Sequence, residues 1–494
     1  NITGAEMTLA GSGSIQANRV AVSSDNTHIQ TTITGDTVSA HSVSKLTIAQ
    51  DAKIAATSHL NLQSHTLEQN GVLSTQGSAT LTAKDLKQSA TGSIAADSDL
   101  SLISDTQKLA GSISSQGKVL LQGKELHSDG VIKAKQIEIE STEKVLIAAP
   151  SQVLSAEHAS INTKVLTNNG QIKGGSISVQ SAASVEQNGT IASQASLEID
   201  VASLTSSSDI VAQGDLRISA TGDVTNNANL LAGKALSLTS NTLSNKGQIK
   251  SGSDTNLDVK QKLNNASSGI VSGNKTTITA NELTNAGTLQ ALDAFNLTVS
   301  SLVNRGSIVA LGDGTLSSAG AINNQGVIYA GNNAYLYSDS LHNTADIVVG
   351  NNLLIARNSE KQKNTSVTNS SGTIESLGGN IGIYTGTIKN IRSTLKTTST
   401  SFLDKRSQFG SEFNANGTAH AASYKRETQC YTKCYNTDKA KHHSVLVAQS
   451  GKEFEVKVYS AIASLLTASP ASRIVASKNL TISAVNVFND ASQI

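Results

Sequence analysis

The sequence predicts an all-β chain folded as an elongated parallel β-helix, a solenoid of ~20-residue turns, with a non-repetitive C-terminal region. Three observations predict this class: a recurring Leu-x-Asn-x-Gly-x-Ile phrase, alternating apolar and polar residues after each phrase, and an unusual composition. Aromatic residues make up 3% of the 494 residues, charged residues 15%, and tryptophan is absent. Because a compact enzyme of this length normally buries large aromatic anchors, the composition favours many short strands over several globular cores.

The phrase is clearest in LSNKGQI (243–249), LTNAGTL (283–289) and INNQGVI (322–328). Its asparagines are 19 or 20 residues apart and fall at Asn245, Asn265, Asn285, Asn304, Asn324 and Asn343. Asparagine tolerates a left-handed backbone and can bond to nearby backbone groups, so we expect these residues at the corners of the turns.

The apolar residue that closes each phrase extends the repeat towards the N-terminus in steps of 18 to 21 residues. The series is Ile54, Leu73, Ile94, Ile113, Ile132, Val153, Ile172, Ile191, Ile210, Leu230, Ile249, Ile270, Leu289, Ile308, Ile328 and Ile347, with weaker marks at Ile33 and Ile15. Roughly the first 355 residues therefore form one array.

The second element of each unit alternates strictly, as in LNL (60–62), LRI (216–218) and YLY (335–337). A period of two places one set of side chains inside and the other in solvent, which indicates short strands rather than helical turns. A leucine-rich repeat has a similar length but a helical second arm, so the parallel β-helix fits better. With turns about 4.8 Å apart, some 18 turns give a rod on the order of 80 Å long.

The period weakens at NSEKQKNTSVTNSSG (358–372) and is lost from about Arg392 to Pro470. No aromatic residue precedes Phe295, whereas eight of the fourteen lie between Phe402 and Tyr459. The repeat then returns: residues 473–494 align on 269–289 with an offset of 204, which places Ile474 on Ile270, Ile482 on Ile278, Val487 on Leu283 and Asn489 on Asn285. We therefore predict a stalk (1–356), transitional coils (357–394), a non-repetitive insertion (395–470) and a resumed coil (471–494).

These residues resemble the filamentous haemagglutinin repeats of two-partner-secreted exoproteins. The run NNLLIARNSEKQKNTSVTNSSGTIESLGGNIGIYTG (351–386) is similar to the CdiA-type effectors of contact-dependent growth inhibition. The resemblance implies a protein secreted to the surface of a Gram-negative bacterium through an outer-membrane transporter. It also implies a stalk followed by a region that binds a receptor on the target cell. The toxin of that family has no counterpart in this sequence.

Both cysteines, Cys430 and Cys434, lie in CYTKCYNTDKAKHH (430–443). In an exported protein, a pair this close favours a small disulfide loop. A zinc site that adds His442 and His443 is an alternative, but its spacing matches no common zinc motif and adjacent histidines rarely bind one ion. Free or intermolecular thiols are the third reading.

The insertion also carries the candidate receptor contacts. Between Lys396 and Ala461, ten Lys or Arg residues stand against six Asp or Glu residues. Tyrosines interleaved with basic residues are typical of binding surfaces, whereas the phenylalanines suit a small core. The candidates are Tyr424, Lys425, Arg426, Tyr431, Lys433, Tyr435, Lys439, Lys441, His442 and His443.

Other function classes lack support in the sequence. The net charge of +1 favours no nucleic-acid partner, and no apolar run approaches the length of a membrane span. Acidic residues show no register across the turns and no catalytic or phosphate-binding motif occurs, so we expect no enzyme activity and no cofactor. We expect a monomer that binds an outer-membrane β-barrel protein of the target cell, with lipopolysaccharide as the alternative receptor. A haemagglutinin-like adhesin that binds through its stalk is the competing function, and a polysaccharide-processing enzyme is the third.

Overall fold

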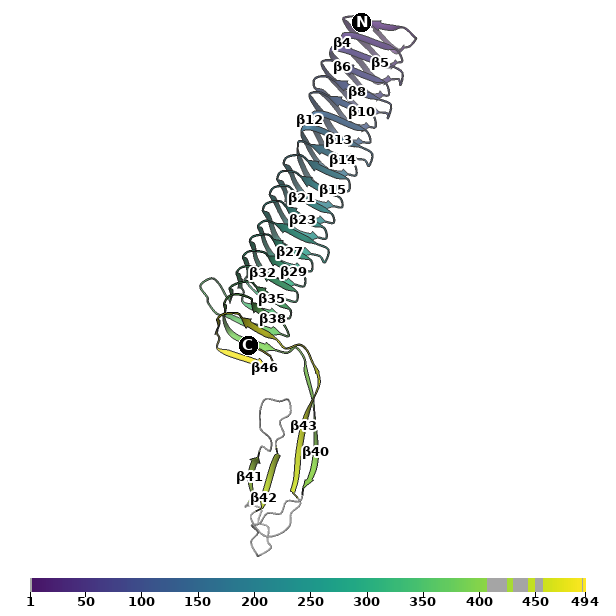
Figure 1. Ribbon diagram of the computed structural model, residues 1–494. Helices are drawn as coiled ribbons and strands as arrows, with labels where there is room; N and C mark the ends of the chain where they lie inside the picture. Colours follow the sequence, from purple (N-terminus) through teal and green to yellow (C-terminus); the bar gives the residue numbers. More distant parts are fainter. Residues whose placement is uncertain (1, 407–423, 430–442, 449–455, 491) are drawn as a thin grey trace, which may run out of the picture.

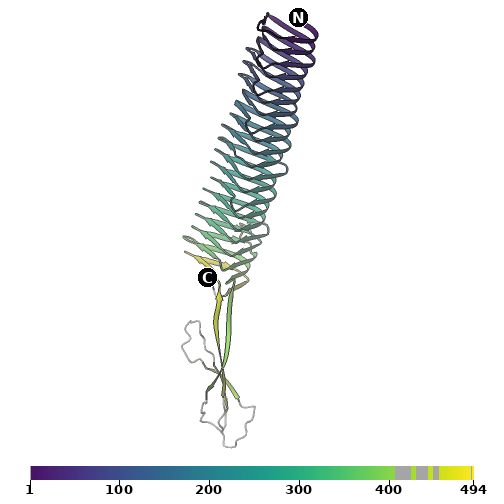
Figure 2. The ribbon, with the colours of Figure 1, turned by 90° about the vertical axis from the view of Figure 1, so that its right-hand side faces the viewer.

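The computed structural model describes residues 2–406, 424–429, 443–448, 456–490 and 492–494, with only the backbone given for the strands between 399 and 463. The described residues form strands and no helix, and about 21 turns of ~19 residues wind into one rod (Figures 1 and 2). The predicted fold class is therefore confirmed. At about 4.8 Å per turn the rod is roughly 100 Å long. It exceeds the expected length because the expected 18 turns covered roughly the first 355 residues, whereas residues 364–391 and 473–490 add further turns.

Each turn contributes one short strand to a parallel stack that runs the length of the rod. The strands of this stack include β6 (Val72–Thr75), β8 (Ser93–Ala96), β10 (Ser112–Ser115), β14 (Gln171–Gly174), β16 (Thr190–Ser193), β18 (Ile210–Ala212), β21 (Asn229–Ala232), β23 (Gln248–Ser251), β25 (Ile270–Gly273), β27 (Thr288–Ala291), β29 (Ser307–Ala310), β32 (Val327–Ala330), β35 (Asp346–Val349), β38 (Thr373–Ser376) and β44 (Arg473–Ala476).

The apolar residues that close each repeated phrase form the buried column of this stack. Ile54 pairs with Leu73, Leu73 with Ile94, and the pairing continues turn by turn to Ile347 and Ile374. One member of the predicted series is wrong: Val271, not Ile270, pairs with Ile249 and is fully buried. The turn after Asn265 has two extra residues before Gly269, so the inward position moves to the second apolar residue.

The asparagines occupy the interior, which corrects the expectation of left-handed corners. Asn245, Asn265 and Asn285 are fully buried at the ends of β22 (Leu236–Asn245), β24 (Thr255–Asn265) and β26 (Thr276–Asn285). Among the described residues, Lys361 and Ser371 are the non-glycine residues with positive φ. Each Asn Nδ2 donates to the Oδ1 of the next turn at 2.8 or 2.9 Å, as from Asn245 to Asn265 at 2.8 Å and from Asn343 to Asn369 at 2.9 Å. The recurring phrase thus encodes a buried amide ladder, which satisfies polar groups that would otherwise be costly to bury.

The glycine of the phrase is explained by close packing between turns. A Cβ on Gly247 would lie 1.8 Å from the carbonyl oxygen of Ala228 in the preceding turn. Glycine is needed here because the backbones of successive turns approach too closely for any side chain.

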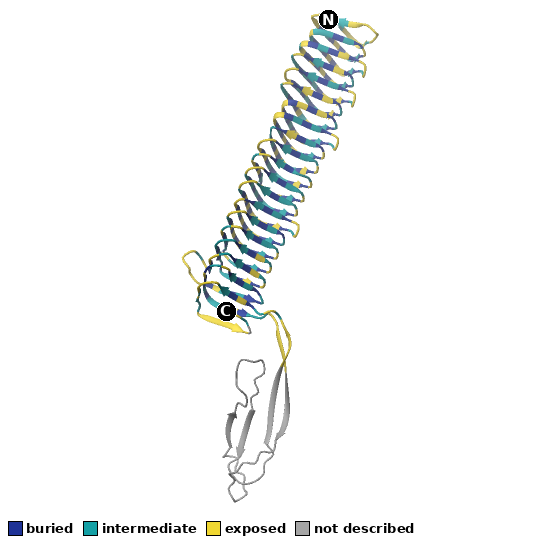
Figure 3. Ribbon diagram, viewed as in Figure 1, coloured by how far each residue is buried: buried dark blue, intermediate teal, exposed yellow. Residues whose placement is uncertain are grey.

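The core is a narrow aliphatic column inside the coil, and buried positions follow every turn (Figure 3). Phe295, at the start of β28 (Phe295–Asn304), is the largest fully buried side chain of the described residues. Outside, oppositely charged residues of adjacent turns form ion pairs, such as Lys45–Glu68 at 2.8 Å and Arg217–Glu198 at 2.9 Å. These exposed pairs contribute about 0–1 kcal/mol each, so burial of the aliphatic column dominates stability.

The solenoid continues across the non-repetitive insertion. β38 and β39 (Ile381–Ile391) pair in parallel with β44, β45 (Leu480–Ser483) and β46 (Asn486–Asp490), which follow the insertion in sequence. Of the four residues aligned at an offset of 204, Ile482, Val487 and Asn489 occupy the same columns as their earlier counterparts. Ile474 instead corresponds to Val271, because it extends the column that runs through Val271.

Candidate binding region at the C-terminal end of the solenoid

The insertion leaves and rejoins the solenoid through a two-stranded ribbon. β40 (Leu395–Arg406) pairs antiparallel with β43 (Val456–Ala468), from Leu395 opposite Ala468 to Arg406 opposite Val456. In Figure 1 this ribbon extends away from the end of the rod. The turns on both sides keep their stacking, so the ribbon is an appendage of an intact coil.

Serine side chains form the neck where the two strands meet the coil. Ser371 Oγ lies 2.7 Å from Ser469 Oγ and accepts from the backbone N–H of Ser393 at 2.8 Å. Ser472 is fully buried and its Oγ donates to the carbonyl of Asn369 at 3.0 Å. Ser371 has a φ of 58°, a left-handed conformation that is uncommon outside glycine. The neck is thus fixed by local hydrogen bonds at the cost of one strained residue.

Four of the ten predicted receptor contacts lie on two paired strands. β41 (Tyr424–Gln429) pairs antiparallel with β42 (His443–Ala448), which places Tyr424 opposite Ala448 and Gln429 opposite His443. Tyr424, Lys425 and Arg426 lie on β41, and His443 begins β42. The other candidates, Tyr431, Lys433, Tyr435, Lys439, Lys441 and His442, belong to the connection 430–442, outside the described residues.

Cys430 and Cys434 lie in the same connection, outside the described residues, so the disulfide stays a prediction. The zinc alternative depends on the same segment. Elsewhere in the described chain, no group of three or more His, Cys, Asp or Glu residues could hold a metal ion. The described residues also contain no helix that could cross a membrane.

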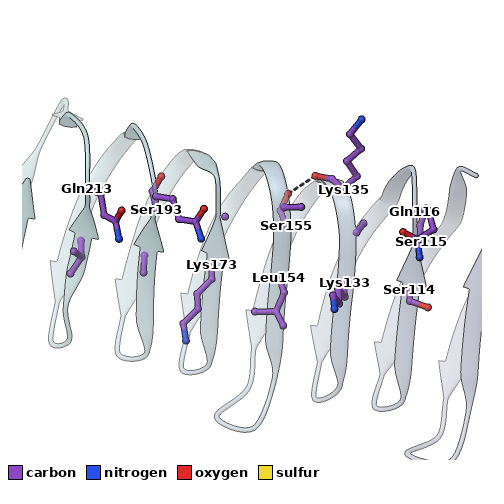
Figure 4. A pocket seen from close by; sticks show the side chains of 16 residues that line it. Ser114, Ser115, Gln116, Lys133, Lys135, Leu154, Ser155, Lys173, Ser193 and Gln213 are labelled. Carbon is purple, nitrogen blue, oxygen red and sulfur yellow. Dashed lines mark hydrogen bonds between the residues drawn. The ribbon is translucent and has the colours of Figure 1, made fainter. Parts of the chain in front are cut away.

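A groove of about 730 Å³ follows one edge of the rod over several turns (Figure 4). Its lining includes Lys133, Lys135, Leu154, Lys173 and Gln213. The hydrogen bond from Gln136 Nε2 at 3.3 Å lowers the pKa of the Glu157 carboxyl, and a hydrogen bond from Lys135, which pairs with Glu157 at 3.2 Å, lowers it further. No acid or base of the Asp, Glu or His type lines the groove.

The tyrosines of the last turns were not predicted as a site. For Tyr335 and Tyr337 on β33 (Ala334–Tyr337) the sequence predicts only strand alternation, and for Tyr384 on β39 it predicts no role. Their signal in the sequence was the concentration of aromatic residues after Phe295. That signal does not show that the tyrosines share one face. Residues 335 and 384 lie on the same face only because the chain coils, which stacks β33, β36 and β39.

A long parallel solenoid with an appended two-stranded ribbon and paired surface charges has the architecture of a stalk. The haemagglutinin repeat model matches residues 148–228, 196–267, 247–326, 291–401 and 442–494, more than half of the chain. The protein belongs to the haemagglutinin-repeat family, which supports a filamentous haemagglutinin-like protein. Members are typically secreted and surface-exposed, and the fold is typically structural or adhesive rather than enzymatic. Neither a curated protein nor a solved structure matches the chain.

Proposed function

We propose that this protein is the extracellular stalk and receptor-binding region of a CdiA-type effector of contact-dependent growth inhibition. The solenoid holds the 395–470 region away from the producing cell. That region docks on an outer-membrane β-barrel protein of a target bacterium, so that a toxin outside this sequence can be delivered. Export occurs through the outer-membrane transporter of a two-partner secretion system.

The observation that carries the proposal is the continuity of the coil around the insertion. Asn390 of the turn before the insertion donates to Asn489 Oδ1 of the turn after it at 2.8 Å. A segment that can be accommodated without disturbing the stacking is free to carry a function unrelated to stability. The repetitive rod presents similar chemistry at every turn, whereas the basic and aromatic residues of the insertion are specific to one place.

The positive charge of the insertion supports a receptor with an acidic surface. The excess of four positive charges between Lys396 and Ala461 suits acidic extracellular loops of a barrel protein. The phosphates of lipopolysaccharide offer the same complementarity and are the alternative receptor. The competing function, an adhesin that binds through its stalk, requires no contribution from the insertion.

The test removes the insertion at its neck. Ser469 N donates to the carbonyl of Thr394 at 2.9 Å, so these residues already form an antiparallel pair. Replacing residues 395–468 with Asn-Gly, a favoured two-residue hairpin turn, should close the chain without strain. Far-UV circular dichroism checks that the rod is retained.

Binding of both proteins to intact Gram-negative cells is then compared before and after protease treatment of the cells. The proposal expects binding by the wild type, loss in the deletion and loss after protease treatment. Binding that survives protease treatment would indicate lipopolysaccharide. Equal binding by both proteins would exclude the receptor-binding role and leave the stalk adhesin.

A further inference from the structure

An aromatic face lies on the outside of the last turns before the insertion. Tyr335 and Tyr337 point outward from β33, and their ring centroids are 6.3 Å apart with an angle of 26° between the planes. The next turns add Leu354 on β36 (Leu353–Ala356) and Tyr384 on β39, in the same two columns. The preceding turn carries Thr315 and Ser317 at the positions of the two tyrosines. The aromatic face is therefore a local departure from a polar surface.

This face is closed on one side by the loop 357–363. Ala356 pairs with Tyr337 and lies on the outward side of β36, yet its side chain is 0% exposed. Lys361 Nζ lies 5.8 Å from the centroid of the Tyr384 ring, within the range of a cation–π contact. Asn358 holds the loop together, since its Oδ1 accepts from Gln362 N at 3.2 Å and its carbonyl accepts from Lys361 N at 3.1 Å.

The other side of the face is bordered by a ladder of exposed asparagines. Asn333, Asn352 and Asn380 precede Tyr335, Leu354 and Gly382 by two residues each, and so share their outward side. Asn352 Nδ2 donates to Asn333 Oδ1 at 3.1 Å, and Asn380 Nδ2 donates to Asn352 Oδ1 at 3.0 Å. Each Nδ2 carries two protons, and the ladder uses one of them. A row of amide N–H donors therefore borders the aromatic floor.

We propose that this face binds a neutral saccharide. Pyranose rings combine an apolar C–H face, which packs on aromatic rings, with hydroxyl groups at their edges, which accept from amides. Two cations of the loop are engaged: Arg357 pairs with Asp339, and Lys361 lies over Tyr384. Two carboxylates border the face: Glu360 in the loop accepts from Ser359, and Asp313 accepts from Asn333 at the start of the ladder. An aromatic floor with amide donors and carboxylates at its border favours a neutral ligand over an acidic one, because Glu360 and Asp313 repel negative charge. The site lies on the solenoid and is independent of the proposed receptor-binding insertion.

The experiment uses the full chain on an array of neutral oligosaccharides that end in glucose, galactose, mannose or N-acetylglucosamine. The best ligand is then titrated by isothermal calorimetry. The test variant is Tyr335→Thr with Tyr337→Ser, which installs the residues of the preceding turn and so preserves the coil. The matched control is Tyr329→Val, because Tyr329 lies on the short-strand face between Val309 and Val348.

The wild type and the Tyr329→Val control should bind the same saccharide, and the double variant should bind at least tenfold more weakly. Absence of binding by the wild type to every neutral saccharide would overturn the assignment. Equal affinity of the double variant and the wild type would also overturn it, because any binding would then arise elsewhere. Loss of binding in the Tyr329→Val control would place the site on the other face. Cell binding through the insertion can fail without affecting these results.

Discussion

Asn390 and Asn489 are 99 residues apart in sequence, yet Asn390 Nδ2 donates to Asn489 Oδ1 at 2.8 Å inside the coil. The same Nδ2 also donates to the carbonyl of Gln493 at 2.8 Å. This contact joins the turns on either side of the insertion and continues the ladder that begins with Asn226 and Asn245. The interior of the rod is thus continuous where its sequence is not.

Breaking that contact should loosen the resumed coil alone. In Asn390→Ala, Asn369 Nδ2 loses its acceptor on residue 390, and Asn489 loses its donor. We expect faster amide hydrogen exchange in residues 473–490, with unchanged exchange before residue 350, because neighbouring turns carry most of the coupling in a solenoid. Uniformly faster exchange along the rod would contradict this local role. Lys478→Ala, which changes an exposed side chain of the resumed coil, is the control.

The middle of the ladder should tolerate substitution poorly. Asn285 accepts from Asn265 Nδ2 and donates to Asn304 Oδ1, both at 2.8 Å, and is fully buried. Asn285→Leu leaves an unpaired acceptor on Asn304, so we expect a loss of about 1–3 kcal/mol. The measurement is the urea midpoint followed by circular dichroism, compared with Asn296→Ala on the exposed surface of β28. Equal midpoints for both variants would show that the ladder is dispensable.

Removal of the insertion should not destabilise the rod. With residues 395–468 replaced by Asn-Gly, the serine contacts of the neck remain, including Ser371 Oγ to Ser469 Oγ. We expect the thermal midpoint of the coil to stay within about 2 °C, since surface loops contribute little to core burial. A large decrease would mean that the insertion packs on the coil and supports it.

Tyr337 should make the protein sensitive to alkaline conditions. Burial raises the pKa of its phenol above the ordinary value of 10.0, with further contributions from Tyr335 and Glu360. A raised folded-state pKa adds stability that is present below pH 10 and is lost as pH rises through the folded pKa. Absorbance of tyrosinate at 295 nm should show a late-titrating group that is missing in Tyr337→Phe. An identical titration of the two proteins would contradict the prediction.

The cysteine pair provides a chemical test of the insertion. If Cys430 and Cys434 form the expected disulfide, protein from an oxidising compartment should react with no thiol reagent until it is reduced. Reduction should add two hydrogen atoms to the intact mass. Two titratable thiols before reduction would instead favour the free-thiol alternative, and zinc recovered in equimolar amount would favour the metal site.

The sequence alone determined the class of fold and the spacing of its turns. A parallel in-register stack places equivalent residues of every turn in the same column, so Ile308 and Ile328 are neighbours both in the period and in space. Periodicity therefore translates directly into structure. Composition likewise located the exceptional region near Cys430, because a uniform rod makes any departure visible.

Other features were decided only by the tertiary structure. Which of Ile270 and Val271 faces inward depends on pairing with Ile249, and a longer turn shifted that pairing by one residue. The ladder of buried asparagines requires a partner one turn away. Local sequence does not show that partner, so the sequence alone predicts corner positions for the asparagines. The face of Tyr335 and Tyr384 exists for the same reason: residues from different turns become neighbours only when the backbone hydrogen bonds between turns fix the coil.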